Sequence, residues 1–161
     1  MLYDVPLTII DYLMAKEVVK SSGHYLEFVP EGLRDYDLCM IAVKSCGYDL
    51  QFVPDKVRDH NIYLAAVSSN GDALGFIPVG MREYDICLAA VSNHGYSLCL
   101  VPIGMRDAKM CLAAVTSDGL ALRFTPMSIR DYNICTIAMK STTNRVLHHV
   151  PLDVLTAIIL E

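Results

Sequence analysis

Cysteines are the residues of this chain that most invite a chemical role, because thiolates bind zinc, form disulfides and act as nucleophiles. None forms a C-x-x-C pair; besides Cys46 and Cys99, four share one repeated position with a tyrosine (Cys39, Tyr63, Cys87, Cys111 and Cys135). Equivalent residues of packed helices lie about 10 Å apart, whereas a zinc–sulfur bond is about 2.3 Å long. We therefore expect buried thiols that fill a core, with no metal and no cofactor.

Arginine followed by an acid is a second such pattern, because a row of arginines can bind phosphates. The pairs are Arg34–Asp35, Arg58–Asp59, Arg82–Glu83, Arg106–Asp107 and Arg130–Asp131. Each cation has its own acid beside it, and 13 basic against 18 acidic residues leave a net charge of −5. The pattern favours Arg–carboxylate pairs that join neighbouring units, while the acid caps its helix. Nucleic-acid binding through the arginines is the alternative.

No combination of residues predicts a catalytic site. The chain lacks a phosphate-binding loop, a G-x-S-x-G nucleophile motif and an H-E-x-x-H zinc motif. His148 and His149 are adjacent, but no carboxylate or thiol pattern accompanies them, which indicates a solvated or half-buried pair. We expect a protein that is not an enzyme.

A row of rings stands just after the capping acids and is the candidate partner surface: Tyr12, Tyr36, His60, Tyr84 and Tyr132. The first turn of a capped helix usually faces solvent, and tyrosine is enriched at binding hot spots. The alternative is that each ring covers the proline or arginine stem of the next unit.

An internal repeat reveals the elements that carry these residues. Proline recurs every 24 residues from Pro6 to Pro126 and again at Pro151, and alanine, glycine and leucine keep the same spacing. Asp59 to Asn70 reads as an α-helix with an acidic N-cap, ended by Gly71 in the left-handed conformation. The following segment alternates like a short strand, but its spacing favours a short α- or 3₁₀-helix. The repeat predicts an all-α solenoid of about six 24-residue units, each a short helix plus a longer α-helix.

The 161 residues are expected to form a single repeat domain, with a cap (1–29), five repeats (30–53, 54–77, 78–101, 102–125 and 126–150) and a truncated helix (151–161). In the cap, Lys16 and Glu17 should be exposed, whereas the equivalent Leu64 and Ala65 should be buried. In the last helix, apolar residues should leave one face open and form a homodimer interface: Leu155, Ile158, Ile159 and Leu160.

The composition excludes disorder, with 53% hydrophobic and 19% charged residues and a mean hydropathy of +0.37. No stretch reaches the roughly 18 apolar residues of a membrane span. No basic segment followed by an apolar one marks a secretory signal at the start. We therefore expect an intracellular protein with reduced thiols.

The strings LRDYDLCMIAV (33–43) and LAAVSNHG (88–95) resemble an uncharacterised tandem-repeat family, domain of unknown function 4116, seen in giant viruses and intracellular bacteria. The resemblance covers residues 6 to about 151. It implies an α-helical repeat fold and a viral or pathogen origin, hence a location in a host cytoplasm or nucleus or in a virion. It transfers no activity and no catalytic residue. Together with the repeat, it leads us to expect a protein–protein interaction or assembly module that engages host proteins.

Overall fold

The computed structural model describes residues 7–21 and 25–160, which form α-helices and 3₁₀-helices and contain no strand. The α-helices are α1 (Leu7–Ser21), α2 (Tyr36–Ser45), α3 (His60–Ser69), α4 (Tyr84–Asn93), α5 (Ala108–Ser117), α6 (Tyr132–Thr142) and α7 (Leu152–Ile159). The longer 3₁₀-helices are η3 (Gly47–Phe52), η5 (Gly71–Phe76), η7 (Gly95–Leu100), η9 (Gly119–Phe124) and η11 (Thr143–His149). The three-residue ones are η1 (Leu26–Phe28), η2 (Glu31–Leu33), η4 (Asp55–Val57), η6 (Val79–Met81), η8 (Ile103–Met105) and η10 (Met127–Ile129).

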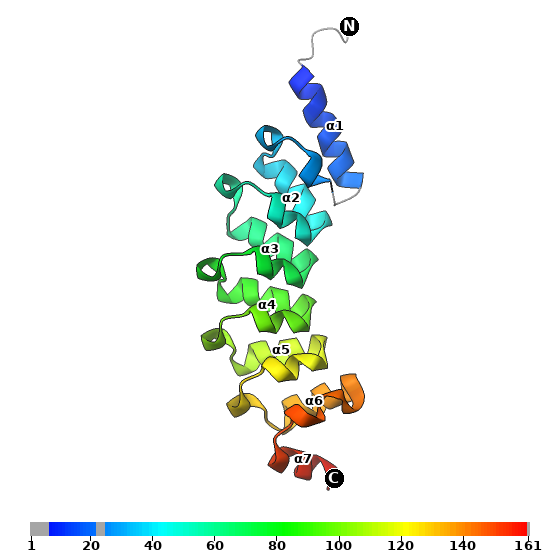
Figure 1. Ribbon diagram of the computed structural model, residues 1–161, viewed down its shortest axis with the longest axis vertical. Coiled ribbons are helices and arrows are strands. Elements are labelled where there is room, and N and C mark those ends of the chain that lie inside the picture. Colours follow the sequence, from blue (N-terminus) through cyan, green and yellow to red (C-terminus); the bar gives the residue numbers. More distant parts are fainter. Residues whose placement is uncertain (1–6, 22–24, 161) are drawn as a thin grey trace.

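The helices stack in two layers along an elongated molecule. Helices α2 to α6 lie in a row, with α1 and α7 at opposite ends of the stack (Figure 1). Each six-residue 3₁₀-helix packs against its own α-helix and the next one, as η5 does against α3 and α4. The three-residue 3₁₀-helices that follow the prolines lie along one edge, on the left of Figure 1. This arrangement is the all-α solenoid of shorter and longer helices that the sequence predicts.

An acid begins most of the α-helices, as predicted. Asp59 Oδ1 accepts a hydrogen bond from the backbone N–H of Ile62 at 2.9 Å, and Asp35, Asp107 and Asp131 cap their helices in the same way. Glu83 makes no such bond. Its longer side chain instead places Oε2 3.3 Å from Nδ1 of His60 in the preceding unit.

The glycine after each α-helix has a different role from the predicted one. Gly71 does not have a left-handed φ, and α3 already ends at Asn70, whose backbone is extended (φ −149°, ψ 116°). A Cβ on Gly71 would overlap the carbonyl oxygen of Ala90 in the next α-helix. Glycine is therefore needed for the close approach of two units, and the predicted left-handed cap is wrong.

The ambiguous segment of each repeat is a 3₁₀-helix, so the strand alternative is wrong. Residues three apart lie on one face of a 3₁₀-helix, and Gly71, Leu74 and Ile77 are all buried. Leu74 and Ile77 belong to the same continuous core as Ile62 and Ala66 of α3. Each fully buried leucine or isoleucine stabilises the fold by about 1.5–3 kcal/mol.

The outer face of the α-helix row is less covered than the repeat suggested. Leu64 and Ala65 are half-buried rather than buried, because this face is covered only in part by neighbouring helices. Glu17 is exposed as expected, but Lys16 is half-buried, with its Nζ 5.9 Å from the centre of the Tyr12 ring. The predicted contrast between α1 and later helices is therefore wrong for three of the four residues. None of the described helices combines the length and the apolar character that crossing a membrane requires.

Candidate interaction surface

The row of rings lies at the surface, but its polar atoms also join one unit to the next. Tyr36, Tyr84 and Tyr132 are exposed, whereas Tyr12 and His60 are half-buried. The hydroxyl of Tyr84 donates to Asp107 Oδ2 at 2.9 Å, so the ring reaches the capping acid of the following helix.

The pKa values of two rings reflect this contact. Desolvation and a hydrogen bond with Asp35 raise the pKa of Tyr12. Desolvation and the hydrogen bond with Asp107 raise the pKa of Tyr84 in the same way. The observed contact of these rings is thus with the next capping acid, a partner that the sequence interpretation did not consider.

His60 belongs to a polar cluster that sequence reasoning missed. Its Nδ1 lies 3.3 Å from Glu83 Oε2 and its Nε2 lies 3.0 Å from Asp85 Oδ2, which joins α3 to the start of α4. One ligand-type atom from each of the three residues lies within 4.8 Å of the others, and no second such cluster occurs among the described residues. A divalent cation could be held here, although both ring nitrogens already face carboxylates. The only sequence signal is a histidine at a tyrosine position, 23 residues before an acid.

The repeated arginines bind backbone carbonyls, so the predicted Arg–carboxylate pairs between units are wrong. Arg106 Nε donates to the carbonyl of Val101 in the preceding unit at 3.0 Å, and its Nη1 donates to that of Phe124 in its own unit at 2.8 Å. The same two bonds occur at Arg34, Arg82 and Arg130. These carbonyls end 3₁₀-helices and need donors, which a fixed guanidinium fork supplies.

Arg58 departs from this pattern. It keeps the bond from Nε to the carbonyl of Val53, and its Nη1 lies 3.3 Å from Asp55 Oδ1. This ion pair lies within one unit, and Asp55 is almost fully exposed. The role of the arginines is therefore structural, as favoured, but their partners are different.

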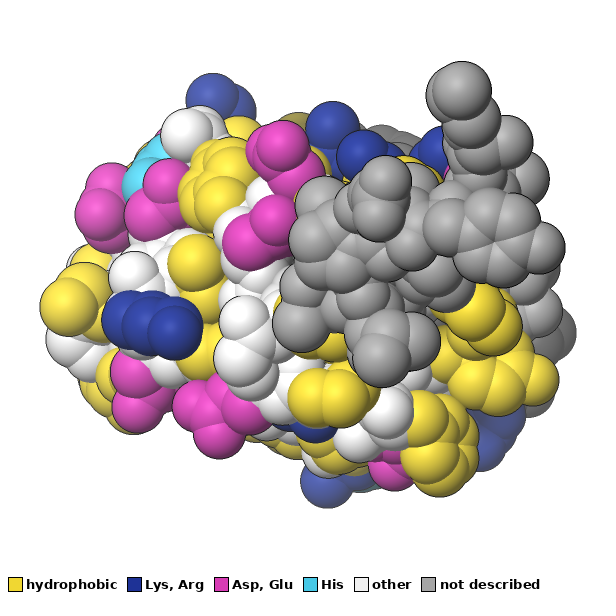
Figure 2. Space-filling model, turned by 90° about the horizontal axis from the view of Figure 1, so that it is seen from above, with side chains coloured by type: hydrophobic (Ala, Val, Ile, Leu, Met, Phe, Trp, Pro, Cys, Tyr) yellow, Lys and Arg dark blue, Asp and Glu magenta, His cyan; other side chains and the backbone are white. Residues whose placement is uncertain are grey.

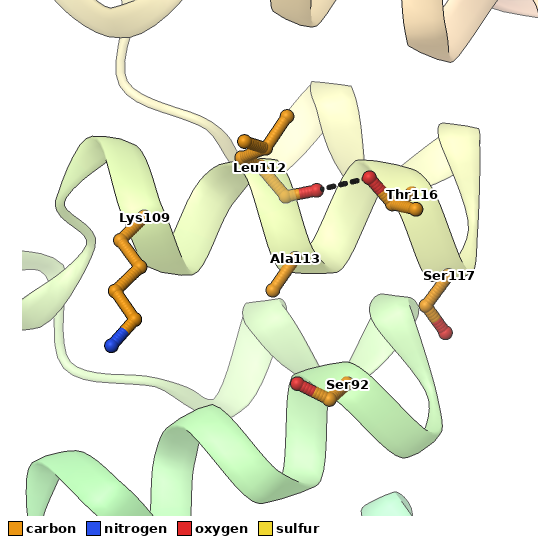
Figure 3. A pocket seen from close by; sticks show the side chains of 6 residues that line it. All are labelled: Ser92, Lys109, Leu112, Ala113, Thr116 and Ser117. Atoms are coloured by element: carbon orange, nitrogen blue, oxygen red, sulfur yellow. Dashed lines mark hydrogen bonds between the residues drawn. The ribbon is translucent and has the colours of Figure 1, made fainter.

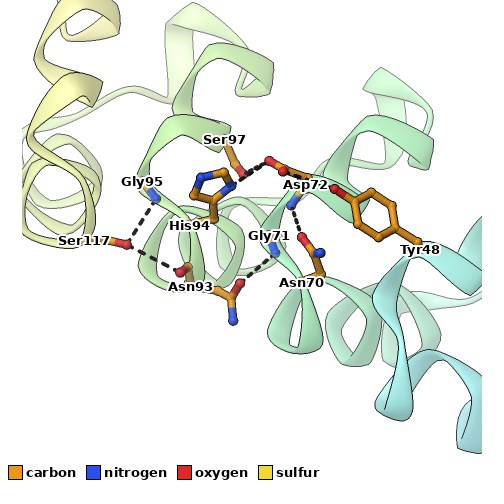
Figure 4. Close-up of polar contacts among 9 residues, drawn as sticks. All are labelled: Tyr48, Asn70, Gly71, Asp72, Asn93, His94, Gly95, Ser97 and Ser117. Atoms are coloured by element: carbon orange, nitrogen blue, oxygen red, sulfur yellow. Dashed lines mark hydrogen bonds and ion pairs between the residues drawn. The ribbon is translucent and has the colours of Figure 1, made fainter. Parts of the chain in front are cut away.

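Asp72 is the centre of a hydrogen-bond network that spans three units (Figure 4). Its Oδ1 lies 2.8 Å from His94 Nδ1 and accepts from Ser97 Oγ at 3.0 Å, and its Oδ2 accepts from Tyr48 Oη at 3.3 Å. The serine bonds the carboxylate and not the imidazole, so the three residues do not form a nucleophilic triad. Tyr48 and Asp72 share one repeat position, but His94 and Ser97 occupy two others, so the network was invisible in the sequence.

A second series of contacts satisfies the glycine N–H groups. The backbone N–H of Gly71 donates to Asn93 Oδ1 at 2.8 Å, and that of Gly95 donates to Ser117 Oγ at 3.1 Å (Figure 4). In both cases the acceptor is the last residue of the α-helix in the following unit. These bonds hold each glycine close to the next helix.

A shallow groove of about 380 Å³ lies on the outer face, between α4 and α5 (Figure 3). Its lining includes Ala113, Lys109 and the hydroxyls of Ser92 and Thr116. Both hydroxyls donate to carbonyls of their own helices at 2.7 Å. Both hydroxyls are therefore already engaged within their own helices.

The thiols and the histidine pair behave as predicted. Cys39, Cys87, Cys111 and Cys135 are buried, and burial raises the pKa of each, that of Cys39 to about 11. His148 is exposed and His149 half-buried. Desolvation, followed by the charge of His148, lowers the pKa of His149.

Apolar side chains lie exposed at both ends of the stack. At the first end, viewed in Figure 2, Met14, Val18 and Phe28 line an apolar groove between α1 and η1. At the other end, Ile159 and Leu160 are 72% and 81% exposed. Leu155 and Ile158 are instead half-buried and pack against the core, so only two of the four predicted interface residues are free to make the contact.

Part of the repeat matches a known protein family. Residues 11–58 and 35–82 each match the family model described as a domain of unknown function (DUF4116). The two matches overlap and start 24 residues apart, which is the spacing of the prolines. No curated protein and no solved structure matches the chain.

Proposed function

We propose that the protein, whose residues 11–82 match the tandem repeat of the DUF4116 family, a domain of unknown function, is a non-enzymatic module for protein–protein interaction or assembly. One observation carries the proposal: successive units stack in register, so equivalent exposed side chains lie in rows along the molecule. Such rows give a solenoid an extended binding surface made of repeated contacts.

The ring row is one candidate contact surface. Tyr36, Tyr84 and Tyr132 are exposed at the starts of α2, α4 and α6. Each offers a large, rigid area with a polar tip, which is why tyrosine is frequent at hot spots. The hydrogen bond of Tyr84 to Asp107 fixes its ring in place before a partner arrives, which lowers the entropy cost of binding.

The proposal is tested by capturing proteins from the native cell on the immobilised chain and identifying them by mass spectrometry. We expect a reproducible partner, and we expect the triple variant Tyr36→Ala, Tyr84→Ala, Tyr132→Ala to lose it while keeping the helical circular dichroism spectrum of the parent chain. An unrelated helical protein of similar charge is the control. Capture of the same proteins on the control and on the chain would contradict the proposal.

Nucleic-acid binding along the arginines is the alternative and has less support. Arg34, Arg82, Arg106 and Arg130 already donate to carbonyls, which leaves few donors for phosphates. Binding to phosphates also requires cations without a compensating acid. A salt titration with random DNA decides between the two functions, because affinity that falls steeply with salt would favour nucleic acid.

A further inference from the structure

Three successive units expose large apolar side chains along the edge formed by the three-residue 3₁₀-helices, on the left of Figure 1. Val79 and Met81 of η6 are 63% and 55% exposed, Ile103 of η8 is 72% exposed and Met127 of η10 is 63% exposed. We name these four residues the apolar edge. Single exposed apolar residues are ordinary, but a repeated row of them marks a contact surface.

Two glycines beside the residues of the apolar edge are not required by close packing. A Cβ on Gly80 or Gly104 would meet no atom within 4 Å, and neither residue has a left-handed φ. Lys56 and Ser128 occupy the same position in other units, so the 3₁₀-helix itself tolerates a side chain. The two glycines therefore leave the backbone uncovered between the apolar side chains, which allows a partner to approach closely.

The same edge is charged in the two preceding units. Glu31 and Asp55 stand where Val79 and Ile103 stand later, and both are exposed. Since these units fold in the same way, the repeat does not require apolar residues at this position. The change from charged to apolar along one edge has a specific pattern: two acidic positions followed by three apolar ones.

We propose that the apolar edge binds an amphipathic α-helix laid along the stack, with apolar residues facing η6, η8 and η10 and basic residues facing Glu31 and Asp55. This inference rests on the proposed interaction function and names the partner class. Packed helical units are spaced about 8–10 Å apart, and seven residues of an α-helix advance about 10.5 Å. A helix with one apolar residue per heptad thus meets one exposed side chain of each unit in turn.

The acidic positions determine which residues the rest of the bound helix must carry. A helix that continues past η6 reaches Asp55, whose side chain is almost fully exposed although Nη1 of Arg58 lies 3.3 Å away. Lysine or arginine at the next heptad positions would pair with Asp55 and Glu31, and acids there would be repelled. A membrane surface is a poorer fit, because none of the residues of η6, η8 and η10 is a cation.

The test is selection of helical peptides from a displayed library of randomised 35-residue helices on the full chain. We expect enriched sequences with three apolar residues at heptad spacing, next to lysine or arginine at the adjoining heptad positions. Ile103→Glu and Met127→Glu should each weaken binding of a selected peptide at least tenfold. Ser92→Glu adds the same charge at an exposed position on the outer face and should leave binding unchanged.

A second variant separates binding from folding. Gly104→Leu adds a side chain into open space, so we expect an unchanged melting temperature and at least tenfold weaker peptide binding. Selected peptides that bind Ile103→Glu and Gly104→Leu as tightly as the parent chain would overturn the apolar edge, while the interaction function would stand. Binding to anionic vesicles that Ile103→Glu abolishes, without any enriched peptide, would reassign the edge to a membrane. If neither peptides nor cellular proteins bind, both proposals fail.

Discussion

Asp72 shows how a single carboxylate can connect three units. Replacing it with alanine should cost about 1–3 kcal/mol, because the buried hydroxyl of Ser97 loses its acceptor. Adding Ser97→Ala should recover part of that loss, since Ala73 and Ala121 occupy the equivalent buried position in neighbouring units. Urea denaturation of the two single variants and the double variant measures this coupling. If Ser97→Ala lowered the free energy of unfolding equally in the presence and absence of Asp72, the coupling between the two residues would be contradicted.

The buried thiols give a chemical test of the core. Alkylation requires the thiolate, and with a pKa of about 11 roughly one Cys39 thiol in a thousand is ionised at pH 8. We expect iodoacetamide to modify Cys46 and Cys99, which are half-buried, well before the four buried cysteines. Peptide mass mapping follows the reaction, and denaturation in urea should make all six react. Rapid labelling of native Cys39 would show that its helix is not packed as described.

At the residue scale, the sequence predicted burial better than it predicted hydrogen-bond partners. The cysteines and alanines of the core follow from their repeated positions, because burial depends on which face a residue occupies. The partners of Arg106 did not follow, since a backbone carbonyl is present at every residue and leaves no sequence signal. Asp107 beside it suggested an ion pair, but its carboxylate caps α5 instead.

At the scale of elements, two glycines give a matched comparison. Gly95→Ala should destabilise the fold by roughly 1–3 kcal/mol, because its Cβ would overlap the carbonyl oxygen of Ala114. Gly104→Ala should be neutral or stabilise by up to about 1 kcal/mol, since its Cβ enters open space and the unfolded chain loses entropy. Thermal melts of both variants measure the two effects. A lower melting temperature for Gly104→Ala than for Gly95→Ala would show that close packing does not explain why glycine recurs at the repeat position of Gly95.

The last 3₁₀-helix, η11, contains an acid-sensitive position. Desolvation lowers the pKa of His149 below its usual 6.5, so below about pH 6.5 the unfolded chain binds a proton more readily than the folded chain. This contribution to stability is present above that pH and is lost as the pH falls through the folded-state pKa. His149→Phe places there the residue found at Phe52, Phe76 and Phe124, and it should lessen the loss.

Melting temperatures of the parent chain and of His149→Phe between pH 7.5 and 5 provide the measurement. The two chains differ only at residue 149, so the difference between the two curves isolates His149. If the melting temperatures of the two chains fell in parallel as the pH is lowered, the role of His149 would be contradicted.

At the scale of elements, the regular spacing of residues along the sequence was the useful signal. The ten-residue α-helices and their acidic caps followed from the sequence. The 3₁₀-helices were harder, because Leu98 and Leu100 alternate as in a strand while Gly95, Leu98 and Val101 recur every third residue. Only packing against the next unit decides between these patterns. The role of Gly95 was missed for the same reason, since a close approach between units has no signature beyond the glycine itself.

For the whole molecule, the 24-residue repeat was enough to predict the architecture. In a solenoid each unit packs mainly against its neighbours, so a correct description of one unit and its period extends to all. The candidate surfaces could be predicted only in part. The ring row was identified from helix starts, but the apolar edge and the His60 cluster depend on how residues of different units come together in space.

The final prediction concerns the assembly of this 161-residue chain. Leu152, Ile159 and Leu160 on and beside α7 are 79%, 72% and 81% exposed, while Val154 and Ile158 hold the helix to the core. Exposed apolar area of this kind favours association, and a two-fold dimer is the commonest closed form. Light scattering at tens of micromolar should give the mass of a dimer, and Ile159→Glu with Leu160→Glu should give a monomer. Thr156→Glu, which adds a charge at an exposed position of the same helix, should remain dimeric. A monomeric parent chain, or a dimer that persists with both charges, would exclude this interface.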